Sequence, residues 1–286
     1  MKSIGYYNGK TGLLSEMTVP IMDRALYFGD GVYDFAFAYS KKIFTLEDHL
    51  DRFFHSMEMM HIQPYCSREK LKEELQRCVD LADTDEGIAV YWQTSRGCTT
   101  PRNHVFPPEG TPSTLLITVT SLHEPDYSVP LKLIAEEDTR FFHCNIKTLN
   151  LIPNVMAAEH AKEKGCQEAV LHRGEYLTEC AHSSLVLLKD GVLMAPPLDE
   201  LILPSISRKH LFALAEKLNI PTEVRKITMD EVWNADELMV LSTSKLCTHA
   251  DTLDGKPVGM KDPETFAKLQ KAYFDWVEKD TGHRMA

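Results

Sequence analysis

The sequence predicts an α+β or mixed α/β fold in two domains. Short runs of β-branched and aromatic residues, bounded by turn signals, occur among segments with helical periodicity. These runs do not follow a regular strand–helix–strand order, which argues against an alternating parallel array. The chain has 286 residues, 43% of them hydrophobic and 26% charged, which is ordinary for a globular protein with a substantial core.

The expected elements of the first domain begin with a hairpin turning at Asn8-Gly9, since both residues of this turn type need positive φ. Residues 32–39 are aromatic and β-branched and predict a strand that turns into residues 43–44. Apolar residues recur at helical spacing over 47–60. Ser67 is a predicted N-cap of the next helix. Residues 88–94 and 115–120 are then expected to be strands.

The pattern breaks at residues 121–125 (SLHEP), which we interpret as a linker between an N-terminal domain, 1–120, and a C-terminal domain, 126–286. Beyond the linker, a helix is expected at 154–164, ended by Gly165, and the segment 228–231 (TMDE) is a capping box that begins another helix. The remaining elements are predicted from periodicity alone. They are strands at 131–135, 169–172, 185–189 and 192–195, and helices at 205–218 and 262–278.

Charge and cysteine content exclude several classes of function. A formal net charge of −11 argues against a nucleic-acid or anionic-membrane partner, because both require clustered basic residues. The seven cysteines are scattered and include no C-x-x-C pair, so we expect reduced thiols, with no disulfide framework and no metal site. The N-terminus lacks the apolar core of a signal peptide and no apolar run approaches a membrane span, so a cytoplasmic protein is expected.

Common nucleotide and hydrolase motifs are absent from the sequence. Residues 29–31 (GDG) lack the third glycine of a dinucleotide loop and precede a predicted strand, where a helix would be required. No phosphate-binding P-loop, zinc-protease H-E-x-x-H motif or G-x-S-x-G nucleophile elbow occurs.

A set of motifs in a defined order carries the functional signal. The segments are 24–33 (RALYFGDGVY), 49–52 (HLDR), 94–97 (TSRG), 145–150 (NIKTLN), 164–169 (KGCQEA), 177–179 (LTE) and 242–244 (STS). Together, their order and spacing resemble those of the class IV (fold-type IV) pyridoxal-phosphate-dependent aminotransferases over essentially the whole chain, and among these the D-amino acid enzymes. The resemblance implies a smaller N-terminal α/β domain and a larger C-terminal domain, with the cofactor at their interface.

Lys147 is the residue that this resemblance makes catalytic. A lysine amine with a pKa near 10.4 is almost entirely protonated at pH 7, and burial or an imine link to an aldehyde overcomes that limit. The apolar neighbours Ile146 and Leu149 favour such a setting. The resemblance implies that Lys147 carries pyridoxal phosphate as a Schiff base and moves a proton between Cα of the amino acid and C4′ of the cofactor.

The resemblance also assigns the cofactor's other contacts. Glu179 is expected to keep the pyridine nitrogen protonated, which makes the ring a better electron acceptor. The planar guanidinium of Arg52 suits a phosphate. Main-chain and hydroxyl donors for that phosphate match a helix start and a loop of small residues. These two sets are Ser205, Ile206 and Ser207, and Ser242, Thr243 and Ser244.

Substrate recognition is expected at Tyr33, Arg102 and His104. In D-amino acid aminotransferases an R-x-H pair from the other subunit of a homodimer and a tyrosine bind the α-carboxylate. Here the pair lies in a loop bounded by prolines, suited to reaching across an interface. The resemblance therefore implies transfer of the amino group of a D-amino acid, D-alanine being typical, to a 2-oxo acid such as 2-oxoglutarate.

Other functions remain open at this point. Within the same fold they are a branched-chain L-amino acid aminotransferase, against which the R-x-H pair argues, and an aminodeoxychorismate lyase. A non-catalytic protein that binds pyridoxal phosphate or another ligand is the alternative from a different class. The chain departs from the family at 180–184 (CAHSS), where a glycine- and serine-rich stretch with an asparagine is common, and at Lys245. We expect His182 and Lys245 to alter the charge of the pocket.

Overall fold

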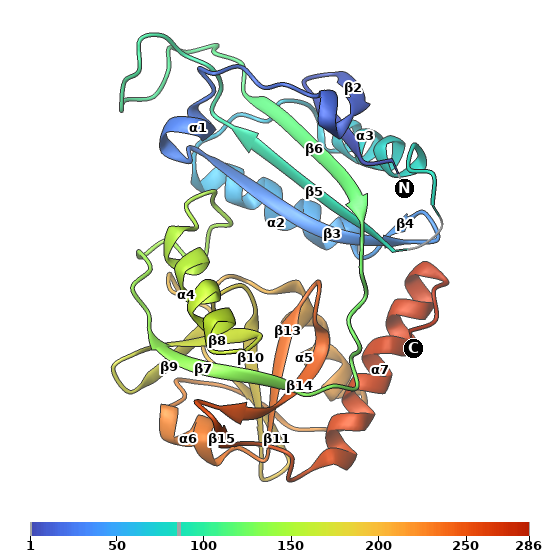
Figure 1. The fold of residues 1–286 in the computed structure, drawn as a ribbon, viewed down its shortest axis with the longest axis vertical. Helices are drawn as coiled ribbons and strands as arrows, with labels where there is room; N and C mark the ends of the chain where they lie inside the picture. Colours follow the sequence, from blue (N-terminus) through green and yellow to red (C-terminus); the bar gives the residue numbers. More distant parts are fainter. Residues whose placement is uncertain (1, 85–86, 286) are drawn as a thin grey trace. The chain divides into compact units, whose positions relative to one another are not determined.

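The computed structural model describes residues 2–84 and 87–285, which group into two compact units (Figure 1). Unit 1 contains the described residues of Met1–Glu124, Ile146–Asn150 and Val277–Ala286. Unit 2 contains Pro125–Asn145 and Leu151–Trp276. Both units combine sheets with helices, so the mixed fold class expected from the sequence is confirmed.

These units differ from the expected domains in two segments, 146–150 and 277–286, which belong to unit 1 although they follow the predicted linker. The first segment runs beside a strand of unit 1, where Tyr33 N donates to Lys147 O at 2.9 Å and Leu149 N donates to Gly31 O at 3.1 Å. Through the second segment, Asp280 Oδ2 accepts a hydrogen bond from Thr45 N at 3.2 Å. Lys147 therefore lies in unit 1, because long-range backbone pairing groups it there.

Unit 1 contains a six-stranded sheet in which all neighbouring strands are antiparallel, in the order β2-β1-β6-β5-β3-β4. The strands are β1 (Ile4–Tyr7), β2 (Lys10–Leu13), β3 (Gly31–Tyr39), β4 (Lys42–Ile43), β5 (Ile88–Ser95) and β6 (Thr114–Ser121). The helices are α1 (Arg24–Phe28), α2 (Leu46–Met59) and α3 (Arg68–Asp80), with a 3₁₀ turn at Leu14–Glu16. Apolar residues of α2 and α3 pack with those of the sheet in one core.

Unit 2 contains a nine-stranded mixed sheet in the order β12-β11-β10-β13-β14-β7-β8-β9, with β15 paired to β14. Three pairs are parallel: β11 with β12, β14 with β7, and β7 with β8. The strands are β7 (Leu131–Glu137), β8 (Glu168–Arg173), β9 (Tyr176–Cys180), β10 (Ser184–Lys189), β11 (Val192–Ala195), β12 (Thr222–Val224), β13 (Glu237–Ser242), β14 (Leu246–Leu253) and β15 (Lys256–Pro257).

The helices of unit 2 are α4 (Ile152–Glu163), α5 (Ile206–Lys217) and α6 (Met229–Asn234), and α7 (Pro263–Thr281) begins in this unit. Helix α4 packs on β7 and β8 through small apolar side chains, Ala157 and Ala161 among them. Helix α5 contacts β13 and β14. No helix in the described part of the chain has the length and apolar character needed to cross a membrane.

Local sequence signals correctly placed several ends of elements. Asn8 and Gly9 take φ values of 46° and 88° between β1 and β2. The Ser67 hydroxyl accepts from Lys70 N at 3.2 Å at the start of α3, and Thr228 with Glu231 forms the expected capping box of α6. The sequence analysis missed β13 and β14. Strand β13 is buried to the same extent as β10, which was predicted, so burial does not account for the difference; the place of β13 in the sheet depends on its pairing with β10 and β14.

Candidate active site

Lys147 is held beside the first residues of β3. In addition to the two hydrogen bonds described above, Thr148 forms an antiparallel bridge with Val32. A Cβ atom on Gly31 would lie 2.3 Å from Thr94 O and 2.8 Å from Leu149 Cδ1. Glycine is therefore required at position 31 for this segment to approach the sheet.

The Lys147 side chain is half-buried and packs on Tyr33. Its Nζ lies 4.3 Å from the centre of the Tyr33 ring, and that ring stacks on Tyr91 at a centroid distance of 5.5 Å. No residue in the described part of the chain accepts a hydrogen bond from Nζ. The structure thus brings together the predicted catalytic amine and one predicted substrate contact.

Arg52 is fixed by a buried carboxylate that the sequence analysis did not identify. Asp34 accepts from Arg52 Nε at 2.9 Å and from Nη2 at 2.7 Å, and its Oδ1 lies 2.8 Å from His49 Nδ1. Burial of Asp34 opposes its ionisation, but Arg52 and His49 outweigh that effect and hold its pKa well below the usual value. Burial lowers the pKa of His49, although Asp34 opposes this shift. The guanidinium is consequently oriented by a carboxylate that stays ionised at neutral pH.

Arg102 and His104 both contact Phe28, the last residue of α1. Arg102 Cζ lies 4.3 Å from the centre of the Phe28 ring, and the His104 ring centre lies 5.1 Å from it. Within residues 2–84 and 87–285, no hydrogen bond or ring contact joins either residue to Lys147 or Tyr33. Arg102 and His104, which lie in a loop, therefore both pack on α1, and both residues are exposed to solvent.

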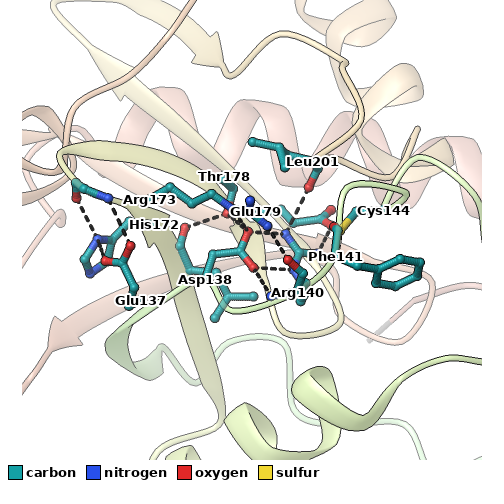
Figure 2. A network of polar contacts seen from close by, with 12 residues as sticks. Glu137, Asp138, Arg140, Phe141, Cys144, His172, Arg173, Thr178, Glu179 and Leu201 are labelled. Atoms are coloured by element: carbon teal, nitrogen blue, oxygen red, sulfur yellow. Dashed lines mark hydrogen bonds and ion pairs between the residues drawn. The ribbon is translucent and has the colours of Figure 1, made fainter.

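Glu179, on β9 of unit 2, lies in a buried polar network with Arg140 at its centre (Figure 2). Arg140 Nη1 pairs with Glu179 Oε1, while Nε and Nη2 each donate to Asp138 at 2.9 Å. Leu203 N donates to Glu179 Oε2 at 3.3 Å. Burial raises the pKa of Glu179 to about 7, although the Arg140 guanidinium opposes the shift. A carboxyl group with this pKa can accept or share a proton near neutral pH.

The predicted phosphate contacts of unit 2 lie at the start of α5 and just after β13. Ser205 caps α5, its hydroxyl accepting from Arg208 N at 3.2 Å. The N–H groups of the first helical residues have no partner within the helix, so those of Ile206 and Ser207 can serve an anion. In the loop after β13, the hydroxyls of Ser242 and Ser244 lie 3.1 Å apart. Helix α5 contacts β13, which ends at this loop.

Arg208 is a further buried cation that the sequence analysis missed. It lies on the first turn of α5 and is 6% exposed. Burial lowers its pKa to about 10, with Glu179 opposing the shift, so the side chain is still charged at pH 7. Its guanidinium carbon lies 5.5 Å from the Phe212 ring centre. The sequence around Arg208 does not show that its side chain is buried, so the sequence alone could not single it out as a site residue.

Lys245 and His182, which depart from the family pattern, meet at a buried carboxylate. Lys245 Nζ lies 3.1 Å from Glu168 Oε2, and Ser183 Oγ donates to the same oxygen at 2.7 Å. His182 Nδ1 lies 3.2 Å from that oxygen, and its Nε2 lies 2.7 Å from Lys245 Nζ. The His182 ring therefore lies between the Glu168 carboxylate and the Lys245 amine. The charge of Lys245 is therefore balanced by Glu168.

Lys245→Met is expected to lower the free energy of unfolding by roughly 3–5 kcal/mol, because it leaves the Glu168 carboxylate buried without its cation. The fall in Tm, measured by circular dichroism, should be roughly 6 °C or more. The control is Glu168→Gln with Lys245→Met, which removes both charges and should recover part of the loss. A Tm unchanged in the single variant would contradict the assignment.

The ion pair between Glu168 and Lys245 also predicts how the stability of the fold depends on pH. Burial raises the pKa of Glu168, but His182, Lys245 and Ser183 more than offset this and bring it to about 2, below the ordinary value of 4.5. The stabilisation is therefore fully present above pH 4.5 and is lost as the pH falls toward 2. Lys245→Met removes one cause of the lowered pKa, so the difference in Tm between wild type and variant should shrink over that range.

Comparison with known proteins shows which family the chain resembles. The model of the family described as amino-transferase class IV matches residues 31–251. A D-alanine aminotransferase of Listeria monocytogenes serotype 4b is 37% identical over 273 residues, which cover 93% of each chain. One of Staphylococcus aureus (strain COL) is 36% identical over 279 residues, or 96% of this chain and 97% of the relative.

Solved structures show the same fold at lower identity. The branched-chain amino acid aminotransferase of Escherichia coli has a TM-score of 0.86 at 21% identity, covering 100% of this chain and 96% of that one. A hypothetical aminotransferase from Mycobacterium tuberculosis, solved in its PLP-bound form, has a TM-score of 0.82 at 20% identity, covering 94% and 98%.

The chain shares its fold with these solved aminotransferases. The chain belongs to the class IV aminotransferase family. The family expected from the sequence motifs is thereby confirmed.

Proposed function

We propose that this chain is a pyridoxal-phosphate-dependent D-amino acid aminotransferase that moves the amino group of D-alanine or a similar D-amino acid to a 2-oxo acid such as 2-oxoglutarate. The observation that carries the proposal is the half-buried Lys147 amine, which no described acceptor engages and which lies against Tyr33. The D-alanine aminotransferases that match more than nine tenths of the chain support the choice of substrate.

The side chains present suit pyridoxal phosphate by their chemistry. The Lys147 amine can bind an aldehyde, and the buried Glu179 carboxyl suits a pyridine nitrogen because its raised pKa allows a proton to be shared near pH 7. Arg52 and the two serine-containing sets, 205–207 and 242–244, would hold the phosphate. When bound, pyridoxal phosphate supplies an electron acceptor for the charge that develops at Cα of the amino acid.

Two acid–base roles follow for this chain's own residues. Lys147 takes the proton from Cα of the donor amino acid, which requires a neutral amine, and in the second half of the reaction it supplies a proton to Cα of the new amino acid formed from the 2-oxo acid. With pyridoxal phosphate bound, Glu179 would hold a proton at the ring nitrogen, its orientation fixed by Arg140 and Leu203 N. We include the remaining site assignments in the proposal: Tyr33, Arg102 and His104 bind the substrate α-carboxylate. The enzyme is proposed to be a homodimer in which Arg102 and His104 reach the neighbouring active site.

The test is incubation of the purified, yellow protein with D-alanine or L-alanine and 2-oxoglutarate, followed by chiral analysis of the glutamate. We expect D-glutamate from D-alanine and little product from L-alanine. L-glutamate formed from a branched-chain L-amino acid would assign the chain to the alternative activity. Purified protein that is colourless and gains no absorbance on addition of pyridoxal phosphate would contradict the cofactor assignment.

A further inference from the structure

Both members of the R-x-H pair contact Phe28 on α1, as do Arg24 and Tyr27. The Arg102 guanidinium carbon lies 4.3 Å from the Phe28 ring centre and that of Arg24 4.8 Å, while the His104 ring lies 5.1 Å away, tilted by 51°. An arginine over an aromatic face is attracted by the ring quadrupole, and a neighbouring ring adds packing. Arg102 and His104 therefore both pack against the Phe28 ring.

The short helix α1 that carries Phe28 is fixed at both ends. Asp23 caps its start by accepting from Ala25 N at 2.9 Å. Gly29 closes its end, with φ at 60° and its N–H bonded to Ala25 O at 3.1 Å. The position of the Phe28 ring therefore follows from backbone that is anchored on each side of the residue.

A buried charge cluster joins α1 to the loop of the R-x-H pair. Arg24 Nε donates to Asp30 Oδ2 at 2.7 Å, and Arg96 Nη2 lies 2.9 Å from Asp30 Oδ1. Arg24 Nη1 donates to Asn103 O at 2.8 Å, which holds the backbone of the residue between Arg102 and His104. Asp30 fixes the Arg24 side chain, and Arg24 in turn contacts both the loop backbone at Asn103 and the Phe28 ring. One arginine therefore positions the loop and the ring together.

We propose that Phe28 and Arg24 are positioning residues that hold Arg102 and His104 in the conformation needed to bind the substrate carboxylate. This inference rests on the carboxylate-binding role of that pair in the proposed function. A long arginine side chain that is ordered before binding loses less conformational entropy when the carboxylate arrives, so its affinity is higher. Neither Phe28 nor Arg24 needs to touch the substrate for this effect.

The test combines Phe28→Leu, which removes the ring, with Phe28→Tyr, which keeps it. Phe28→Leu is expected to raise KM for D-alanine and for 2-oxoglutarate, and the inhibition constant of propionate, by roughly 5- to 30-fold. Phe28→Tyr should stay within about twofold of wild type, because the aromatic face is kept. The cofactor absorbance and kcat should change little in either variant, since the site of Lys147 is untouched.

Arg24→Lys supplies an independent measurement if Phe28→Leu does not fold. Lysine keeps the charge beside Asp30 but cannot also reach Asn103 O, so KM and the propionate constant should rise roughly 10-fold. Phe106→Leu is the matched control, because that ring belongs to the same loop yet lies over Arg96, 3.8 Å from its guanidinium carbon. It should leave KM within about twofold of wild type, since it contacts neither member of the pair.

The outcomes separate this inference from the proposed function. If wild type converts D-alanine but Phe28→Leu and Arg24→Lys bind propionate as wild type does, the positioning role is wrong. A rise in Phe106→Leu equal to that in Phe28→Leu would also overturn it, because the effect would then belong to the loop as a whole. If wild type forms no glutamate from D-alanine, the proposed function fails instead, whatever the variants do.

Discussion

Lys147→Ala is expected to abolish transamination, with kcat falling by roughly 10²- to 10⁴-fold through loss of the acid–base group alone. The protein should also lose its covalent attachment to pyridoxal phosphate. Steady-state rates with D-alanine and 2-oxoglutarate measure the first effect. Borohydride reduction followed by peptide mapping measures the second, since wild type should carry the reduced cofactor on the Lys147 peptide.

Lys162→Ala is the matched control for Lys147→Ala, because this exposed lysine on α4 makes only a surface ion pair with Glu159. Its rate and its absorbance should equal those of wild type. If Lys147→Ala retains near wild-type turnover, or if borohydride labels another lysine, the catalytic assignment is wrong.

Arg102→Ala is expected to lower kcat/KM for D-alanine by roughly 10- to 150-fold, chiefly through KM, because a charge-assisted hydrogen bond to the substrate carboxylate is lost. The absorbance of bound cofactor should not change. Titration with propionate, which has a carboxylate but no amino group, measures the loss of carboxylate binding without turnover.

Arg68→Ala is the control for Arg102→Ala, because Arg68 pairs with Glu47 and Asp51 at the surface of unit 1. It should leave kcat/KM within about twofold of wild type. An equal KM for D-alanine in Arg102→Ala and wild type would remove Arg102 from the substrate site. A loss of cofactor absorbance in Arg102→Ala would show that the residue supports the fold or the cofactor instead.

Elements that depend on neighbouring residues could be predicted from sequence. The Asn8-Gly9 turn, the Ser67 cap and the capping box at Thr228 each involve groups within a few residues, and the structure has all three. Helix α2 could be predicted because it is amphipathic, with one face in the core. Strand β13 was not predicted, although it is buried to the same extent as β10, which was; its place in the sheet depends on pairing with the distant β10, which local sequence does not show.

Some residues of the candidate site could likewise be predicted from the sequence, and others could not. The ordered motifs predicted Lys147, Arg52 and Glu179 as site residues, and the family match confirms the class of enzyme to which those motifs belong. Their partners Asp34 and Arg140 were missed, since each is an ordinary charged residue in the sequence. Lys245 was noticed only as a departure, and its pairing with Glu168 spans 77 positions.

The sequence by itself therefore determined the class of enzyme, most of the local elements and the candidate catalytic lysine, because these depend on residue type, order and short-range hydrogen bonding. Only the tertiary structure decided that the Lys147 segment belongs with β3 and that Phe28 contacts Arg102 and His104. It also decided which buried carboxylate balances each cation. The physical reason is that an ion pair or a ring contact between distant residues depends on burial and backbone pairing, and neither is encoded in the few residues on either side.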